Sequence, residues 1–251
     1  MLKYQQRVML FVVISVGLII FYALNTISIL EIADLVGSVL LVSWIFMIVL
    51  LRTHNHTKAL YYGFLGQIAY GIFRTRYFSE IYRERIGTLF TGYESLMGSS
   101  IAENGNGQFD LIMEQLQKIM IDYQMAIWTI SMIFAVYIAT LFLAKRIPVK
   151  WQHHFIRFPY SVVYIFMAAL LLAIIPSTRL FGLNCVMIVA AVLLIQGLAI
   201  LDFWCKKYLK NSRFVLLAAV ILMFFNVFFA VMVSLLGLID NWLDIRKINQ
   251  I

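Results

Sequence analysis

Charged residues are scarce in this sequence. Asp, Glu, Lys and Arg together make up 13% of the 251 residues, whereas hydrophobic residues make up 63%. A soluble domain carries about a quarter charged residues and about half apolar ones. This balance excludes an ordinary soluble globular protein and indicates a chain embedded in lipid.

Cysteine and proline are also rare. The two cysteines, Cys185 and Cys205, lie in or at the end of apolar runs and show no metal-ligand spacing. They indicate buried small apolar residues and no disulfide framework. The three prolines, Pro148, Pro159 and Pro176, fall at the boundaries of apolar runs, where a missing N–H does least harm.

Apolar runs long enough to cross a bilayer recur along the chain. A hydrocarbon core of about 30 Å needs roughly 20 apolar residues of helix. We expect spans at residues 8–30, 32–51, 124–144, 158–175, 180–204 and 214–239. Residues 59–73 form a shorter segment, about 22 Å long as a helix, which spans only with tilt or local thinning of the bilayer. The predicted fold class is therefore all-α, a polytopic transmembrane helical bundle of six to seven spans in one domain, residues 1–251.

One substantial hydrophilic region, residues 74–123, separates the N-terminal spans in 1–73 from a C-terminal four-helix part in 124–251. It opens with arginines among aromatic and aliphatic residues, which suits a helix at the headgroup level. The sequence ENGNGQ at 103–108 favours a turn. Apolar residues then recur at helical spacing from Phe109 to Tyr123. We predict an interfacial amphipathic region here.

Lysine and arginine gather between the spans, at residues 145–157 and 206–213. The positive-inside rule puts both clusters on the cytoplasmic side, together with Arg52 and Lys58. Two crossings must then separate residues 52–58 from 145–157, which favours counting 59–73 as a span. Seven spans leave the C-terminus outside, whereas six spans put both termini on one side. The distribution of charge is compatible with either number of spans. The net charge of +8 indicates topology and anionic headgroups, and we expect no nucleic-acid partner.

Groups that catalyse bond chemistry are sparse. All four histidines, at positions 54, 56, 153 and 154, lie in basic loops, and no carboxylate or cysteine nearby completes a metal set. No nucleophile–base set or carboxylate pair falls in a span. We expect no enzyme activity, no metal and no cofactor.

Amide side chains inside the last two predicted spans are the candidate ligand-binding residues. They are Asn184, Gln196 and Asn226. An amide buried in hydrocarbon without a partner costs several kcal/mol, so these groups either hydrogen-bond between helices or line a pocket for a neutral polar ligand. No charged residue lies in the middle of these helices, which argues against a proton-coupled pump.

Two features are candidates for contact with a partner subunit. Small residues repeat every four positions and permit close packing within the chain or against another subunit; they are Ala135, Ala139, Ala169 and Ala173. The C-terminal stretch GLIDNWLDIRK, residues 237–247, either anchors the last helix at the interface or docks another protein. Its charged candidates are Asp240, Asp244 and Arg246, with the aspartates facing the basic residues at helical spacing.

The order of elements from Phe158 onward resembles the YybS-like bacterial membrane proteins, an uncharacterised family. The shared elements are an aromatic–proline pair at 158–159, GLN at 182–184, QGLA at 196–199, a basic loop and the closing GLIDNWLDIRK. That family is distantly similar to the substrate-binding membrane subunits of energy-coupling-factor vitamin transporters. The resemblance implies a multi-pass protein of the bacterial inner membrane that captures a small solute and relies on a separate ATPase module, since the sequence has no Walker motif. The alternative is a membrane scaffold or assembly factor that acts through protein contacts.

Overall fold

A computed structural model describes residues 28–101, 107–143, 153–208, 218, 220–223 and 225–246 of the chain. Across these ranges every regular element is helical and no strand occurs, which confirms the all-α class. The predicted first span at 8–30 and the basic residues at 145–150 lie outside the described residues, apart from the last three positions of that span.

The first described helix runs through three segments, α2 (Ile29–Asp34), the π-helix η1 (Leu35–Leu41) and α3 (Val42–Thr53). A capping box starts α2, in which Ser28 and Glu31 satisfy each other's backbone N–H. The helix ends at His54, whose φ of 49° turns the chain back toward α4 (His56–Ile101). α3 and the first part of α4 pack side by side as an antiparallel hairpin.

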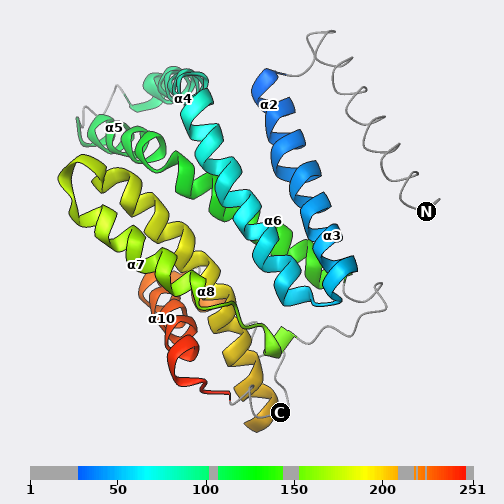
Figure 1. The fold of residues 1–251 in the computed structure, drawn as a ribbon. Helices are drawn as coiled ribbons and strands as arrows, with labels where there is room; N and C mark the ends of the chain where they lie inside the picture. The colour runs from blue at the N-terminus through cyan, green and yellow to red at the C-terminus, as the bar shows by residue number, and fades with distance from the viewer. Residues whose placement is uncertain are drawn as a thin grey trace.

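α4 is too long to cross a bilayer as one straight rod. Its 46 residues would extend about 69 Å at 1.5 Å per residue. Figure 1 shows that α4 turns at the end of the bundle, where its second half and α5 (Gly107–Asp122) lie across the ends of other helices. The first part is buried within the bundle at Ala59, Leu60 and Phe64. Residues 59–73 therefore run with the spanning helices, and the predicted interfacial region lies at the end of the bundle.

The second half of the chain is organised around α8 (Arg179–Tyr208), which contacts α6 (Gln124–Leu143), α7 (Ser161–Ile174) and α10 (Val227–Leu243). Short 3-10 turns, η3 (His153–Phe155) and η4 (Pro176–Thr178), precede α7 and α8. In the described residues three helical stretches are long and apolar enough to cross a membrane: Ile29–Thr53, Gln124–Phe142 and Pro176–Lys207. α7 and α10 are shorter apolar helices, so the structure supports a membrane-crossing bundle without confirming six or seven spans.

The prediction of one continuous span at 214–239 is wrong, because the helix breaks at Asn226. The backbone there is extended, with φ −140° and ψ 103°, and the Asn226 side chain accepts hydrogen bonds from the N–H groups of Phe228 and Phe229. α10 then runs parallel to α8, since Ser234 contacts Ala190 and Asp240 contacts Gln196. The C-terminal ends of α8 and α10 therefore point toward the same end of the bundle.

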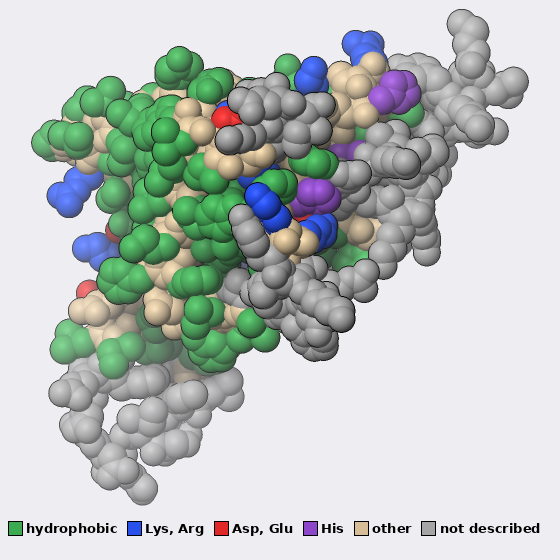
Figure 2. Space-filling model, turned by 90° about the horizontal axis from the view of Figure 1, so that it is seen from below, with side chains coloured by type: hydrophobic (Ala, Val, Ile, Leu, Met, Phe, Trp, Pro, Cys, Tyr) green, Lys and Arg blue, Asp and Glu red, His purple; other side chains and the backbone are tan. Residues whose placement is uncertain are grey.

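The described residues of the basic loops, 52–58, 153–157 and 206–208, share one end of the bundle. Lys206 donates to Nδ1 of His154 at 2.9 Å, which joins the end of α8 to η3. Near the α3–α4 turn, Tyr61 hydrogen-bonds Ser161 at the start of α7. Figure 2 views this end and shows His side chains with Lys and Arg side chains near the centre and upper right of a largely hydrophobic surface, while other Lys and Arg side chains lie at the left edge. Arg246 lies at the same end, because its guanidinium reaches the His154 carbonyl. The described end of the chain is therefore on the side of the basic loops.

Candidate functional site

An apolar groove opens between α6, α8 and α10, and Phe166 of α7 contributes to its wall. Its volume is about 460 Å³, within the range of roughly 300–1,000 Å³ that small-molecule sites occupy. Ser234 is the one polar side chain among those that line it, and its hydroxyl donates to the carbonyls of Ala190 and Ala230. The groove therefore offers hydrophobic contact and few hydrogen bonds.

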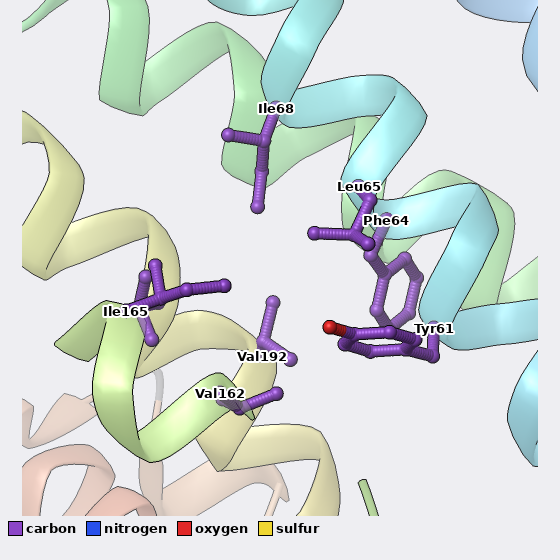
Figure 3. Close-up of a pocket in the computed structure, with 8 residues that line it drawn as sticks. Tyr61, Phe64, Leu65, Ile68, Val162, Ile165 and Val192 are labelled. Carbon is purple, nitrogen blue, oxygen red and sulfur yellow. The ribbon is translucent and has the colours of Figure 1, made fainter. Parts of the chain in front are cut away.

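A second cavity between α4, α7 and α8 is far smaller, at about 20 Å³. Figure 3 shows the side chains of Ile68, Ile165 and Val192 around it, with the Tyr61 hydroxyl at its edge. That hydroxyl is already bonded to Ser161. A space that holds about one water and has apolar walls stays dry, so we regard it as a packing gap.

Asn184 joins α8 to the start of α6. Its Oδ1 accepts from the Ala126 N–H at 2.9 Å, and its Nδ2 donates to the carbonyls of Asp122 and Leu180 at 3.0 and 2.9 Å. These bonds bridge the break between α5 and α6, where backbone groups lack helical partners. Asn184 is 3% exposed and does not line the groove.

Gln196 joins three segments near the middle of α8. Its Oε1 accepts from the Phe158 N–H at 3.0 Å, and its Nε2 donates to the Gly237 carbonyl at 3.0 Å and to Asp240 at 3.3 Å. Asn226 caps α10. The structure thus places the three predicted amides apart from one another and bonds each to the protein. Their role in ligand binding stays a prediction, and the geometry favours the helix-to-helix alternative for Asn184 and Gln196.

The two alanine pairs have different surroundings. Ala169 is buried. Ala173 lies close against α8, because a Cβ added at Gly182 would lie 2.2 Å from the backbone nitrogen of Ala173. This pair serves packing within the chain. Ala135 and Ala139 are exposed on α6, so the predicted contact with a partner stays a prediction for that pair.

The charged residues in the last turn of α10 and just after it face inward. Nη2 of Arg246 lies 2.6 Å from Oδ2 of Asp240, and both side chains are 0% exposed. The same guanidinium donates to the carbonyls of His154 and Ile156 at 2.7 and 2.8 Å. Asp244 pairs with Arg157 at 2.7 Å. We call these residues, together with Gln196, the C-terminal cluster.

The expected helical spacing within this stretch is wrong for Asp244. α10 ends at Leu243, and Asp244 has φ 42°, in the left-handed region. The chain reverses there, so Arg246 folds back onto Asp240, while Asp244 reaches Arg157 of the loop before α7. In the described structure, both predicted docking carboxylates contact this chain's own arginines.

His153 lies in a polar group that the sequence analysis missed. Its Nδ1 is 3.1 Å from Asp202 of α8, and its Nε2 contacts the Tyr137 hydroxyl of α6. Lys206 donates to both Asp202 and His154. Burial and the Lys206 ammonium hold the pKa of His154 below its usual value. The pattern along the sequence did not predict that a carboxylate, that of Asp202, lies beside these histidines. No group of three metal-binding side chains occurs among the described residues.

A partly buried ion pair lies near the opposite end of the bundle. Arg74 of α4 is 5% exposed, and its Nε donates to Asp34 at 2.8 Å. Tyr70 also donates to Asp34, and the guanidinium lies over the rings of Trp128 and Tyr82 at 4.9 and 5.4 Å. The sequence pattern placed Arg74 in the hydrophilic region and did not predict this pair. The one hint in the sequence was Asp34, an acidic residue directly before a long apolar run.

Comparison with known proteins adds one relationship. Residues 1–241 match the model of a family described as "Predicted membrane protein (DUF2232)". No curated protein and no solved structure matches the chain. The family description names neither YybS-like proteins nor energy-coupling-factor subunits, so those finer resemblances stay predictions. The match spans nearly the whole chain, and the apolar helices agree with its description. The chain belongs to the predicted membrane protein family DUF2232.

Proposed function

We propose that this protein is a subunit of the bacterial inner membrane that binds a small, largely apolar molecule and relies on a separate ATPase module for any transport step. The observation that carries the proposal is the groove of about 460 Å³ between α6, α8 and α10. It lies in the C-terminal part, where the sequence analysis expected a solute to bind.

The chemistry of the groove selects the ligand class. Its walls are hydrophobic apart from Ser234, and a site of this kind gains affinity from apolar area and little from hydrogen bonds. The amides of Asn184, Gln196 and Asn226, which favoured a neutral polar ligand, form hydrogen bonds with protein groups outside the groove. We therefore propose an apolar or amphipathic solute that reaches the groove from the lipid.

The proposed partner follows from the resemblance described above. The sequence has no Walker motif, so energy for transport has to come from another subunit. The end of the bundle with the basic loops is the side on which a cytoplasmic ATPase module meets a membrane subunit. The proposal assigns no bond chemistry to this chain.

Ligand-dependent stabilisation tests the groove. Protein purified in detergent is heated with a panel of apolar and amphipathic metabolites, since a ligand that binds only the folded state raises Tm. Ala230→Phe places a large side chain in the groove, and Ala135→Phe places the same side chain on an exposed face of α6.

We expect at least one metabolite to raise the Tm of the wild type and of Ala135→Phe, and to leave Ala230→Phe unchanged. If nothing in the panel raises Tm, or if Ala230→Phe responds as strongly as the wild type, the groove is not a ligand site. A rise with phospholipid alone means that acyl chains fill the groove, which also contradicts the solute proposal.

A scaffold or assembly function remains the second candidate, and one observation favours it. α5 exposes a row of apolar side chains at the end of the bundle, made of Leu111, Ile112, Leu116 and Ile119. Purification from native membranes under mild detergent separates the two functions. An ATPase module that co-purifies supports the transporter subunit, whereas a biosynthetic or cell-division complex supports the scaffold.

A further inference from the structure

The groove between α6, α8 and α10 has a packed floor and small side chains along its walls. Ala190 and Ala191 of α8 and Ala230 of α10 line it, and each leaves space that a larger side chain would fill. Ala191, Leu193 and Leu238 close its floor, since all three are buried. The groove therefore has room for a ligand, which lies against close-packed helices.

The outer side of the groove opens toward the surrounding lipid. Val227, Val231 and Leu235 line it along α10 and are 75%, 50% and 41% exposed. The lining residues of α10 extend from Val227 to Leu238, which is about 16 Å at 1.5 Å per residue. An elongated apolar molecule therefore fits along α10 and enters from the side.

The lining of the groove carries no charge. Asp, Glu, Lys, Arg and His are absent from the lining residues that the structure describes. A charged group moved from water into apolar surroundings without a partner costs far more free energy than a neutral one. The groove therefore favours a neutral ligand over a carboxylate, a phosphate or an ammonium ion.

Ser234 is the polar side chain in this lining, and its hydrogen is already in use. The hydroxyl donates to the carbonyl oxygens of Ala190 and Ala230, both at 3.0 Å. A serine hydroxyl has one hydrogen and two lone pairs that accept. In the described part of the chain, Ser234 Oγ acts in these bonds as a donor alone. The group that the groove offers to a ligand is therefore a hydrogen-bond acceptor.

This arrangement distinguishes ligands that donate from ligands that only accept. A ligand hydroxyl that donates to Ser234 Oγ adds one hydrogen bond and breaks none. An ester or ketone oxygen has to take the serine hydrogen away from a carbonyl, so one bond replaces another with little net gain. An alcohol therefore gains more from Ser234 than an ester or a hydrocarbon with a similar chain.

We propose that the groove selects neutral amphiphilic alcohols, and that Ser234 determines this specificity by accepting a hydrogen bond from the ligand hydroxyl. Ser234 lies seven residues from Val227 and four from Leu238, so the longer apolar stretch, roughly 10 Å, lies toward Val227 and holds the ligand tail. This inference rests on the proposed function, because it requires the groove to be a ligand site.

Direct binding of three matched probes tests the inference. Radiolabelled lauryl alcohol, methyl laurate and dodecane have apolar chains of similar length and differ in their polar group. Binding to protein purified in detergent is measured by scintillation proximity, and the signal of Ala230→Phe, in which the groove is filled, is subtracted as background. For each variant, the affinities for the alcohol and the ester are divided by that for dodecane, so partition into micelles cancels when variants are compared.

Two substitutions of Ser234 and one matched control are compared with the wild type. Ser234→Ala removes the hydroxyl, and Ser234→Thr keeps it. Ser131→Ala is the control, because Ser131 also donates to the carbonyl four residues before it, that of Ile127 at 2.8 Å, on an exposed face of α6 outside the groove.

We expect the alcohol-to-dodecane ratio to be about three- to ten-fold lower in Ser234→Ala than in the wild type, the effect of one net hydrogen bond. The ratio should stay at the wild-type value in Ser234→Thr and Ser131→Ala. The ester-to-dodecane ratio should be the same in Ser234→Ala and in the wild type, because the ester gains little from the hydroxyl.

The outcomes separate this inference from the proposed function. If dodecane binds the wild type above background but Ser234→Ala leaves the alcohol ratio unchanged, the selectivity for alcohols is wrong and the groove is still a ligand site. If the ester ratio falls as much as the alcohol ratio, Ser234 acts as a donor and the proposed selectivity is wrong. If none of the three probes binds the wild type above the Ala230→Phe background, both the inference and the proposed function are overturned.

Discussion

Arg246 and Asp240 form an ion pair of 2.6 Å that is closed to solvent on both sides, although only five residues separate them in the chain. The guanidinium also bonds two carbonyls of the loop before α7, and Gln196 bonds the carboxylate. The partners come from three segments, which are α10, α8 and the loop before α7. The C-terminal cluster therefore ties the end of α10 to α8 and to the η3 loop.

Removal of one partner of this pair should destabilise the protein strongly. We expect Arg246→Gln to lower the free energy of unfolding by about 3–5 kcal/mol, because it leaves Asp240 buried and unpaired. SDS titration of the purified protein in mixed micelles measures the loss. Arg157→Gln is the matched control, since the Arg157–Asp244 pair is partly exposed, at 14% and 24%.

The double variant Asp240→Asn/Arg246→Gln should lose less than Arg246→Gln alone, since it leaves no buried charge. Equal losses for Arg246→Gln and Arg157→Gln would show that burial of the pair has no special weight.

Gly237 and Gly197 set the closest approach of α8 and α10. A Cβ at Gly237 would lie 2.1 Å from the Leu193 carbonyl oxygen, and one at Gly197 would lie 2.0 Å from that of Val233. Gly237→Ala should therefore force the helices apart and cost about 1–3 kcal/mol. Gly87→Ala is the control, because nothing lies within 4 Å of its added Cβ. A thermal-unfolding experiment in which Gly237→Ala is as stable as Gly87→Ala would contradict this packing.

Asn184→Leu separates a structural role from a role in ligand binding. Loss of the side chain leaves the Ala126 N–H and the Asp122 carbonyl without partners, and we expect a loss of about 1–3 kcal/mol in the free energy of unfolding. Because Asn184 does not line the groove, the rise in Tm with a groove ligand should persist. If the variant has unchanged stability and no longer responds to the ligand, Asn184 takes part in ligand binding and this structural role is wrong.

The pH dependence of stability should include a contribution from His154. Its pKa in the folded protein is lowered from 6.5, so the unfolded chain takes up a proton first as the pH falls. Stability is then full above pH 6.5 and is lost as the pH falls through 6.5 toward the lowered value. Wild-type Tm should drop between about pH 7.5 and about pH 5.5, and His154→Gln should drop less. An equal drop in Tm for the wild type and His154→Gln would show that His154 does not contribute to the pH dependence of stability.

Much of the helical layout follows from hydropathy. The predicted span at 124–144 corresponds to α6 (Gln124–Leu143), and that at 180–204 falls within α8 (Arg179–Tyr208). Segments of this length and apolarity have one stable state in lipid, a helix with its backbone groups satisfied internally. Local composition is enough to predict such elements.

The breaks and the pairings were harder to predict. Asn226 lies in an unbroken apolar run, and the interruption comes from one side chain that caps the following helix. His153 and Asp202 meet only because η3 lies against α8, and Arg74 of α4 meets Asp34 of α2. Such contacts depend on how each helix is rotated and placed. Hydropathy along the chain contains no information on either.

The central claim is that the basic loops and the end of α10 lie on one side of the membrane, with the α7–α8 turn on the other. Cysteines at Asn55, Trp242 and Ser177, introduced singly in a chain without Cys185 and Cys205, test it with a membrane-impermeant thiol reagent. In intact cells we expect label at Ser177→Cys alone, and at Asn55→Cys and Trp242→Cys only after the membrane is opened. Label at Trp242→Cys or Asn55→Cys in intact cells, alongside Ser177→Cys, would contradict the arrangement of these helices.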